Sequence, residues 1–317
     1  MRSKVLVFVI GILGVTCRSA SCYSPPDQIE MAKRLYQVEQ LARDHTKESM
    51  EKLVSISLSE SESLPARRLA CRFISQIGTS EVLKGKQNLI STSDLLGPSW
   101  RLAETVVAMR ERGDAKQEIA KTLLSFWTEL TKTVPGEDKE ASILRGIRQS
   151  LAAGEIAFQI ADLNLPADGF PSVIRSRPEV VFHKLRAQYA GLNGPSERSR
   201  WISEQLSTED PAIREAAARL LAEEGEAVLP QLIAILQSNL PTSDGPPFTS
   251  KHRAYSAALE VLAGIGGDGV AAVLTVLIEN EVGYVAENAK FYLRWVNAGV
   301  LYPVRYKRLL NESPIDE

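Results

Sequence analysis

The chain has 317 residues, of which 44% are apolar and 24% are charged, and its formal net charge at pH 7 is −2. These proportions are those of a folded globular protein, and they exclude a disordered chain or a strongly basic nucleic-acid-binding protein. Only 6% of the residues are aromatic, a composition that favours helices over sheets. The length suits one extended repeat domain or two compact domains.

The start of the chain has the layout of a secretory signal peptide. Arg2 and Lys4 give a basic beginning, residues 5–15 form an unbroken apolar run, and the small residue Ser21 follows. The apolar run is shorter than the about 20 residues that a membrane-spanning helix needs. The sequence therefore predicts a signal peptide over residues 1–21 and export to a secreted, periplasmic or cell-envelope location.

Two other fates of this segment remain open. In the first, the segment stays attached as a membrane anchor. In the second, Cys17 or Cys22 is acylated, although neither cysteine follows the Leu-Ala-Gly pattern of lipoprotein signals. Cleavage would remove three basic residues and no acid, so that the net charge becomes −2 − 3 = −5. An acidic mature protein has no general attraction for nucleic acid. Only Cys22 and Cys71 would remain, so we expect no disulfide framework.

Residues 22–163 are predicted to form an N-terminal helical region. In its first stretch apolar residues recur at three- and four-residue spacing, as one face of a helix requires: Ile29, Ala32, Leu35, Val38, Leu41 and Ala42. A second helical stretch lies between Met50 and Leu58, and Asp114, with Gln117 three residues later, is expected to cap a further helix. No stretch alternates apolar and polar residues between turn signals, so we expect no sheet.

Helix-breaking residues divide the chain at three places. Residues 133–138 form a short turn, and residues 240–248, with four helix breakers, form the longest loop. Residues 164–171 form the third break, a linker or turn. This break is the best boundary between the N-terminal region and a second half over residues 172–317.

The second half contains an internal repeat, seen first in residues 208–236. Asp210 is placed to cap a helix, Pro211 fits its first turn, and Gly225 is placed to end it. A second helix must then fold back on the first. A similar unit follows at a distance of 266 − 225 = 41 positions, with Gly266 in the place of Gly225. Two helices every 40 residues or so is the period of HEAT and armadillo arrays.

The first of these helices resembles that of a HEAT repeat, which typically reads Asp-Pro-x-hydrophobic-Arg. Here Asp210, Pro211, Ile213 and Arg214 supply that pattern, whereas the second unit lacks the Asp-Pro start. The clear resemblance covers about residues 208–280. It implies an α-solenoid of HEAT-like helical pairs with additional N-terminal helices. It also implies structural roles for four residues: Asp210 and Arg214 as bridges between repeats, and Gly225 and Gly266 in turns.

Two motifs come close to known cofactor or catalytic motifs. Residues 264–269 fit G-x-G-x-x-G, but a helix precedes them where a dinucleotide-binding site has a strand, so we expect a repeat turn. Residues 97–101 approach the nucleophile elbow but lack its final Gly, and Ser99 is expected to cap the following helix.

The remaining reactive side chains give no pattern of a catalytic or metal site. His45, His183 and His252 are far apart in the sequence, and no metal-binding motif occurs. Cys71 lies among apolar residues and is expected to be a buried, inert thiol. We therefore expect no catalytic residue, no cofactor and no metal.

The end of the chain interleaves aromatic and basic residues between Tyr284 and Arg308. Such a pattern can hold an anionic partner, through charge and stacking, and the candidate partner-binding residues are Lys290, Arg294, Trp295 and Arg305. The alternative is that the aromatic residues close the core at the end of the helical array while the basic residues face water.

These observations favour an exported, non-enzymatic scaffold that binds another exported protein or peptide and no nucleic acid. One alternative is a membrane-tethered envelope protein, in which Cys22 is acylated or the signal is retained. The other is an enzyme or enzyme accessory on a HEAT-like fold. A pocket that gathers His183, His252 or several carboxylates from separate helices would favour that reading.

Overall fold

The computed structural model describes residues 25–86, 95–132, 136–241, 249–281 and 283–311. Over these ranges the chain is helical throughout and has no strand, which confirms the predicted all-α fold. The predicted signal peptide, Cys22 and most of the predicted loop at 240–248 lie outside the described residues.

The N-terminal half has one short and several long helices: α2 (Pro25–Asp44), α3 (Lys47–Leu58), α4 (Leu64–Ile77), α5 (Ser80–Leu83), α6 (Gly97–Arg112), α7 (Lys116–Thr131) and α8 (Lys139–Asp162). The second half continues with α9 (Ser172–Arg175), α10 (Pro178–Ala190), α11 (Pro195–Ser207), α12 (Pro211–Glu224), α13 (Leu229–Ser238), α14 (Ser250–Ile265), α15 (Asp268–Asn280), α16 (Tyr284–Asn297) and α17 (Lys307–Asn311). Two 3₁₀ turns, η1 (Gly225–Val228) and η2 (Val304–Tyr306), precede α13 and α17.

The limits of α12 and α14 follow from local capping. Asp210 accepts hydrogen bonds from the backbone amides at the start of α12, and Thr249 does the same for α14. Both helices end at a glycine with positive φ, Gly225 at 64° and Gly266 at 71°. A side chain would strain the backbone in this region, which explains the glycine at both positions.

Two of the predicted caps are wrong. The residue before α7 is Ala115, and Asp114 instead pairs with Arg112 at 2.6 Å. Ser99 lies inside α6 and is buried, because the helix already begins at Gly97. Pro98 fits the first turn of a helix, and this moves the start of α6 two residues before the predicted cap.

The repeat-like helices pack side by side. Helix α12 contacts α10, α11 and α14, and α14 also contacts α13 and α16. Small residues at the contact, among them Ala217 and Ala258, are completely buried and let the helix backbones approach closely. These side chains belong to one large apolar cluster that reaches from Phe182 to Tyr292.

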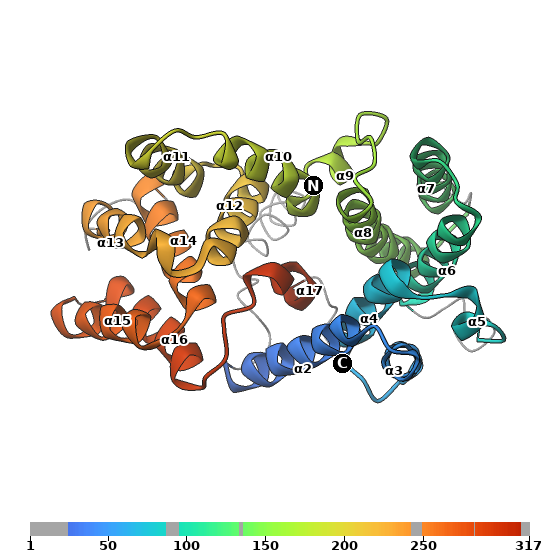
Figure 1. The fold of residues 1–317 in the computed structure, drawn as a ribbon, viewed down its shortest axis with the longest axis horizontal. Coiled ribbons are helices and arrows are strands. Elements are labelled where there is room, and N and C mark those ends of the chain that lie inside the picture. Colours follow the sequence, from blue (N-terminus) through green and yellow to red (C-terminus); the bar gives the residue numbers. More distant parts are fainter. Residues whose placement is uncertain (1–24, 87–94, 133–135, 242–248, 282, 312–317) are drawn as a thin grey trace, which may run out of the picture.

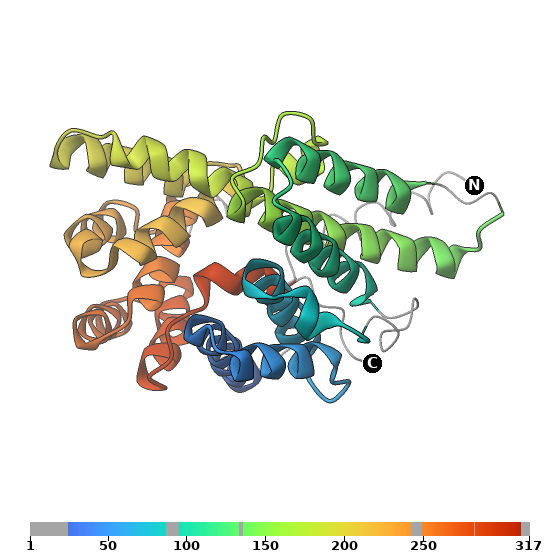
Figure 2. The same cartoon turned by 45° about the vertical axis from the view of Figure 1, so that its right-hand side comes forward.

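The N-terminal half has two apolar clusters of its own. One joins α2, α3, α4 and α6, and the other joins α6, α7 and α8. Residues 163–171 belong to the second cluster, because Leu165 and Phe170 are buried in it. This break is therefore a packed turn. In Figure 2, α7 and the start of α8 project from the body of the molecule.

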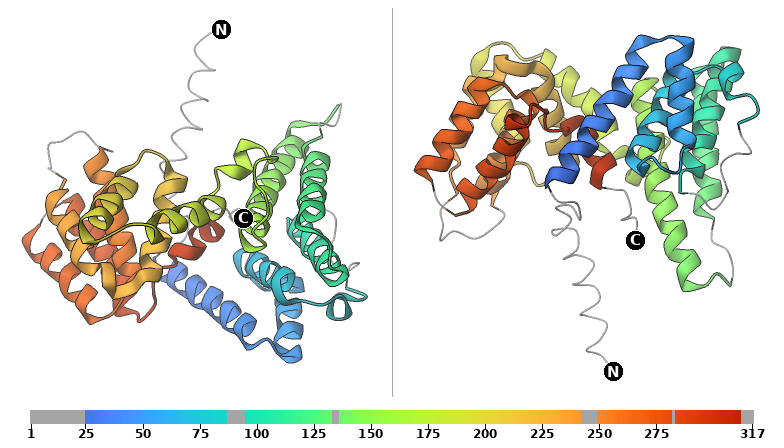
Figure 3. Two further views of the ribbon diagram at one scale, coloured as in Figure 1. Left: turned by 45° about the horizontal axis from the view of Figure 1, so that its top comes forward. Right: turned by 90° about the horizontal axis from the view of Figure 1, so that it is seen from below.

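The end of the chain returns to its beginning. The helices follow one another around a ring, and α17 lies near its middle (Figures 1 and 3). Residues 299–311, here named the C-terminal segment, cross from α16 to the N-terminal half. Tyr306 and Leu309 are buried in the cluster of α2, α3, α4 and α6. Trp295 and Val300 pack against Ala32 of α2. The C-terminal segment thus closes the ring.

Among the described helices, none has the length and apolar character required to cross a membrane.

Candidate functional site

The C-terminal segment lies along the groove between α12 and α14, on the inner side of the ring. The amide of Tyr302 donates a hydrogen bond to the carbonyl of Ala263 at 2.9 Å. Gly264 makes this approach possible, because a Cβ there would lie 2.7 Å from Cγ2 of Val304 and 3.2 Å from Cβ of Ala222. Residues 300–303, the non-helical part of the segment, are thus held between α12 and α14 by a backbone hydrogen bond and close packing.

Ion pairs fix the far end of the segment. Nζ of Lys307 lies 2.5 Å from Oε2 of Glu260 on α14, and Nε of Arg308 donates to Oε2 of Glu215 on α12 at 2.7 Å. Burial opposes the charged form of Lys307, but Glu260 outweighs it and raises the pKa of the ammonium above its ordinary value. Lys307 is therefore charged at neutral pH.

A hollow of about 290 Å³ opens beside these ion pairs, and we name it the polar pocket. Its walls come from α12, α14, α16 and α17 and carry mainly polar side chains, including Arg214, Glu215, His252, Ser256, Glu260 and Tyr284. Its volume lies at the lower end of the range for small-molecule sites, about 300–1,000 Å³. It is large enough for a side chain or a short piece of a ligand.

The hydrogen bonds of the polar pocket leave one acceptor unused. Oγ of Ser256 and the hydroxyl of Tyr284 lie 2.7 Å apart, and Nδ1 of His252 lies 2.8 Å from Oγ1 of Thr249. Glu260 is 7% exposed, and its Oε1 has no hydrogen-bond partner among the described residues. A buried carboxylate oxygen without a partner is unusual, because most buried polar atoms are hydrogen-bonded. This oxygen is itself buried, so that a donor group reaches it only if a neighbouring side chain moves.

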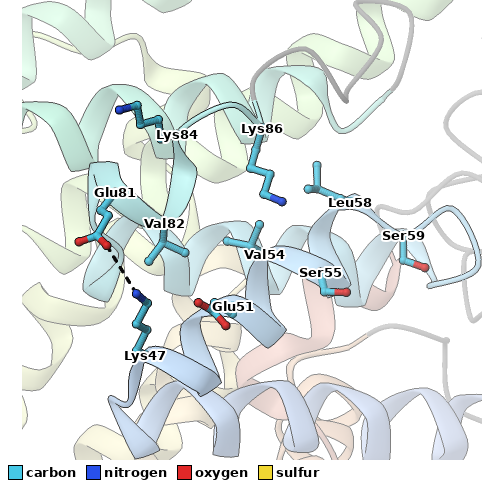
Figure 4. Close-up of a pocket in the computed structure, with 10 residues that line it drawn as sticks. All are labelled: Lys47, Glu51, Val54, Ser55, Leu58, Ser59, Glu81, Val82, Lys84 and Lys86. Atoms are coloured by element: carbon cyan, nitrogen blue, oxygen red, sulfur yellow. Dashed lines mark hydrogen bonds and ion pairs between the residues drawn. The ribbon is translucent and has the colours of Figure 1, made fainter.

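A second hollow, of about 570 Å³, lies between α3 and α5 (Figure 4). The ammonium group of Lys86 points into it toward Val54 and Leu58. Lys47 and Glu81 form an exposed ion pair at its rim, 3.5 Å long. The hollow is lined by charged, polar and apolar side chains, and its charged groups Lys47 and Glu81 are already paired with each other.

No protein-family model, no curated protein and no solved structure matches this chain. The function must therefore be argued from the inner groove and the polar pocket themselves.

The two repeat residues of α12 act within their own segment. Asp210 caps α12, and Nη1 of Arg214 donates to the carbonyl of Thr208 at 2.7 Å. The arginine that reaches a neighbouring segment is Arg253 on α14, whose Nε donates to the carbonyl of Ser207 at the end of α11 at 3.0 Å. Arg253 belongs to the part of the second unit that lacks the Asp-Pro start, so the sequence pattern did not single it out.

The candidate partner-binding residues lie in three different settings. Lys290 is exposed on α16 and pairs with Glu287 at 2.7 Å, and Arg294 is exposed one turn further along the helix. Trp295 is 1% exposed and belongs to the core. Arg305 lies in the C-terminal segment. The structure therefore does not bring these four side chains together on one surface.

Several residues of the polar pocket were not singled out from the sequence. Ser256 and Glu260 lie on α14 with His252, one helical turn apart from one another, and so share one face of the helix. The four-residue spacing of these polar residues is visible in the sequence, but the apolar residues of the same helix give the stronger repeat pattern. Cys71 is buried, as predicted, and the described residues contain no cluster of His, Cys, Asp and Glu that could hold a metal ion.

Proposed function

We propose that this protein is an exported, non-enzymatic scaffold, built as an α-solenoid of HEAT-like helical pairs, whose inner face binds another exported protein or peptide. The supporting observation is the C-terminal segment in the groove between α12 and α14. A surface that holds its own chain through a backbone hydrogen bond and terminal ion pairs has the chemistry to hold the chain of another protein.

The polar pocket is the part of this inner face that the C-terminal segment leaves open. Its positive and negative side chains suit the donors and acceptors of a peptide. Tyr284, 51% exposed at the edge of the pocket, offers an aromatic ring of the kind that is enriched at protein interfaces.

The test is to fill the pocket and follow partner capture. Ser256→Trp places a large side chain in the pocket, whereas Thr275→Trp makes the same change at an exposed position of α15. The protein and both variants would each be cross-linked to the exported proteins of the source organism. The captured proteins would then be identified by mass spectrometry. We expect a partner captured by the protein and by Thr275→Trp to be lost with Ser256→Trp. Equal capture by all three would contradict a role for the pocket.

Export itself is tested by the intact mass of the protein isolated from the source. Cleavage after Ser21 gives a chain that begins at an unmodified Cys22. An added lipid mass would favour the membrane-tethered alternative, and an uncleaved chain would favour a retained anchor.

A second candidate function, an enzyme, is favoured by the gathering of His252 with the carboxylates of Glu215 and Glu260 in one pocket. These groups come from two helices, and a histidine or a carboxylate is the usual general acid or base of an enzyme. The hydrogen bonds of His252 and Ser256 go to Thr249 and Tyr284, so they do not form a nucleophile–base pair. Turnover of a captured partner that His252→Gln abolishes without reducing its binding would establish this alternative.

A further inference from the structure

Four arginines from four separate segments meet on the inner side of the ring. Arg43 comes from α2, Arg186 from α10, Arg219 from α12 and Arg305 from the C-terminal segment. Together they line a cleft of about 410 Å³, which we name the arginine cleft. The C-terminal segment forms one wall of this cleft through Leu301, Tyr302, Val304 and Arg305.

Two carboxylates neutralise only part of this charge. Glu39 is 2.8 Å from Arg43 and 2.8 Å from Arg305, and Glu223 is 3.0 Å from Arg219. Arg186 has no ion pair within the described part of the chain; its guanidinium lies 5.9 Å from the ring of Phe182. Among the residues that line the cleft, four guanidinium groups face two carboxylates, which leaves 4 − 2 = 2 positive charges uncompensated within the lining. Glu179 and Asp162 lie outside the lining and act on Arg219 and Arg305 from further away.

Of the four arginines, Arg219 is the one whose charge water only partly screens. The side chain of Arg219 is 23% exposed, and its guanidinium lies 3.9 Å from the centre of the Phe182 ring. Burial and the nearby charge of Arg305 lower the pKa of Arg219. Burial, Arg219 and Arg186 likewise lower the pKa of His183, one turn before Arg186 on α10, and outweigh Asp162 and Glu223, which raise it. Like charges crowded in this way disfavour the empty cleft and favour an anion in it.

We propose that the arginine cleft binds the dianionic phosphate group of a phosphate monoester. Two excess positive charges match the charge of that group, and its oxygens can accept hydrogen bonds from several guanidinium forks at once. A carboxylate carries one charge and two oxygens, and it would leave one positive charge uncompensated. This inference rests on the cleft alone and is independent of the peptide-binding role proposed for the polar pocket.

Titration calorimetry of the protein as isolated from its source tests the proposal. Phenyl phosphate, inorganic phosphate, sulfate and acetate are the probes, in buffer of low ionic strength. We expect phenyl phosphate to bind at neutral pH and acetate to bind at least about tenfold more weakly. Binding of phenyl phosphate should weaken below about pH 6, where the group loses its second charge, while that of sulfate should not. Inorganic phosphate binding tighter than phenyl phosphate would identify the free ion as the ligand instead.

Matched variants locate the binding. Arg186→Gln should weaken phenyl phosphate at least about tenfold, the loss expected for one hydrogen bond to a charged group. Arg198→Gln is the control, because Arg198 is also exposed and lies 5.4 Å from an aromatic ring, that of Tyr189, outside the cleft. Glu223→Gln should tighten binding by about threefold, since it removes a negative charge from the cleft. A variant that merely unfolds cannot produce this gain.

The imidazole of His183 provides a separate readout. An anion beside Arg186 and Arg219 offsets their charge, so the pKa of His183 should rise when phenyl phosphate binds, as followed by NMR and assigned with His183→Gln. The proposal is overturned if phenyl phosphate fails to bind, if Arg186→Gln and Arg198→Gln bind it equally, or if acetate binds as tightly.

Discussion

At the scale of single residues, the most demanding feature is a buried ionic contact between α4 and α8. Glu155 of α8 is 2% exposed and lies 2.7 Å from Arg68 and 2.8 Å from Arg72. Burial alone would raise the pKa of Glu155, but Arg72 and Arg68 outweigh it and hold that pKa below its ordinary value. The carboxylate is thus charged at neutral pH and joins two helices of the N-terminal half.

Removal of this charge should be costly. Glu155→Gln leaves two guanidinium groups beside a neutral amide, and we expect it to lower the free energy of unfolding by about 3–5 kcal/mol. Urea unfolding followed by circular dichroism measures the change. Glu140→Gln, at an exposed position of the same helix, is the control and should change stability by no more than about 0.5 kcal/mol. An equal effect of the two substitutions would contradict the role of Glu155.

The same carboxylate should make stability depend on acid. The pKa of Glu155 is lower in the folded state than its ordinary value of 4.5, so the unfolded chain takes up this proton first as the pH falls. Its contribution is therefore complete above pH 4.5 and is lost progressively below it, toward the folded-state pKa. As the pH is lowered from about 6 to about 3, the free energy of unfolding should fall less steeply for Glu155→Gln than for the unchanged protein.

At the scale of elements, the sequence predicted most helices but only some of their ends. Asp210 and Gly225 delimit α12 because a capping carboxylate and a glycine at positive φ act locally. Asp114 and Ser99 have the same local chemistry but are not used as caps, because the start of a helix also depends on which turn packs into the core. Asp114 stays outside α7, and Ser99 is buried inside α6.

The fit of the C-terminal segment in its groove depends on one glycine of α14. Gly264→Ala would place a Cβ 2.7 Å from Cγ2 of Val304, so the segment must shift away. We expect faster cleavage by trypsin after Arg305, Lys307 or Arg308, followed by mass spectrometry, because the loosened segment is more accessible. Gly269→Ala is the control, since a Cβ there meets no atom within 4 Å. Unchanged cleavage in Gly264→Ala would show that the groove tolerates the added methyl group.

The contacts of the candidate site join residues that are far apart in the sequence, and most of them could not be predicted from it. The repeat pattern placed α12 and α14 next to each other, and His252 was noted as a possible member of a pocket. Lys307 and Glu260 are 47 positions apart, and no local pattern connects them. Arg305 was singled out for partner binding, but its neighbours Glu39 and Arg219 lie in segments that only the closed ring brings together.

At the scale of the whole molecule, the N-terminal core is completed by the last described residues. Leu309 is 1% exposed and packs in the cluster of α2, α3, α4 and α6. Leu309→Ala should therefore lower the free energy of unfolding by about 2–5 kcal/mol, as for other buried leucines. Hydrogen exchange should become faster in α2 and α4, far away in the sequence. Faster exchange confined to α17 would contradict the closure of the ring by this segment.

Ring closure also sets the order in which the fold can be completed. Tyr36 and Leu301 are joined by a hydrogen bond across 265 positions, and Glu39 and Arg305 by an ion pair across 266. A chain that leaves the ribosome from its N-terminus has formed α2 long before its partners exist. Contacts of such separation also form slowly, because a very long loop must close before they stabilise anything. The ring therefore closes last, after all its helices have formed, and until then the apolar face of α2 that receives Trp295 and Val300 remains uncovered.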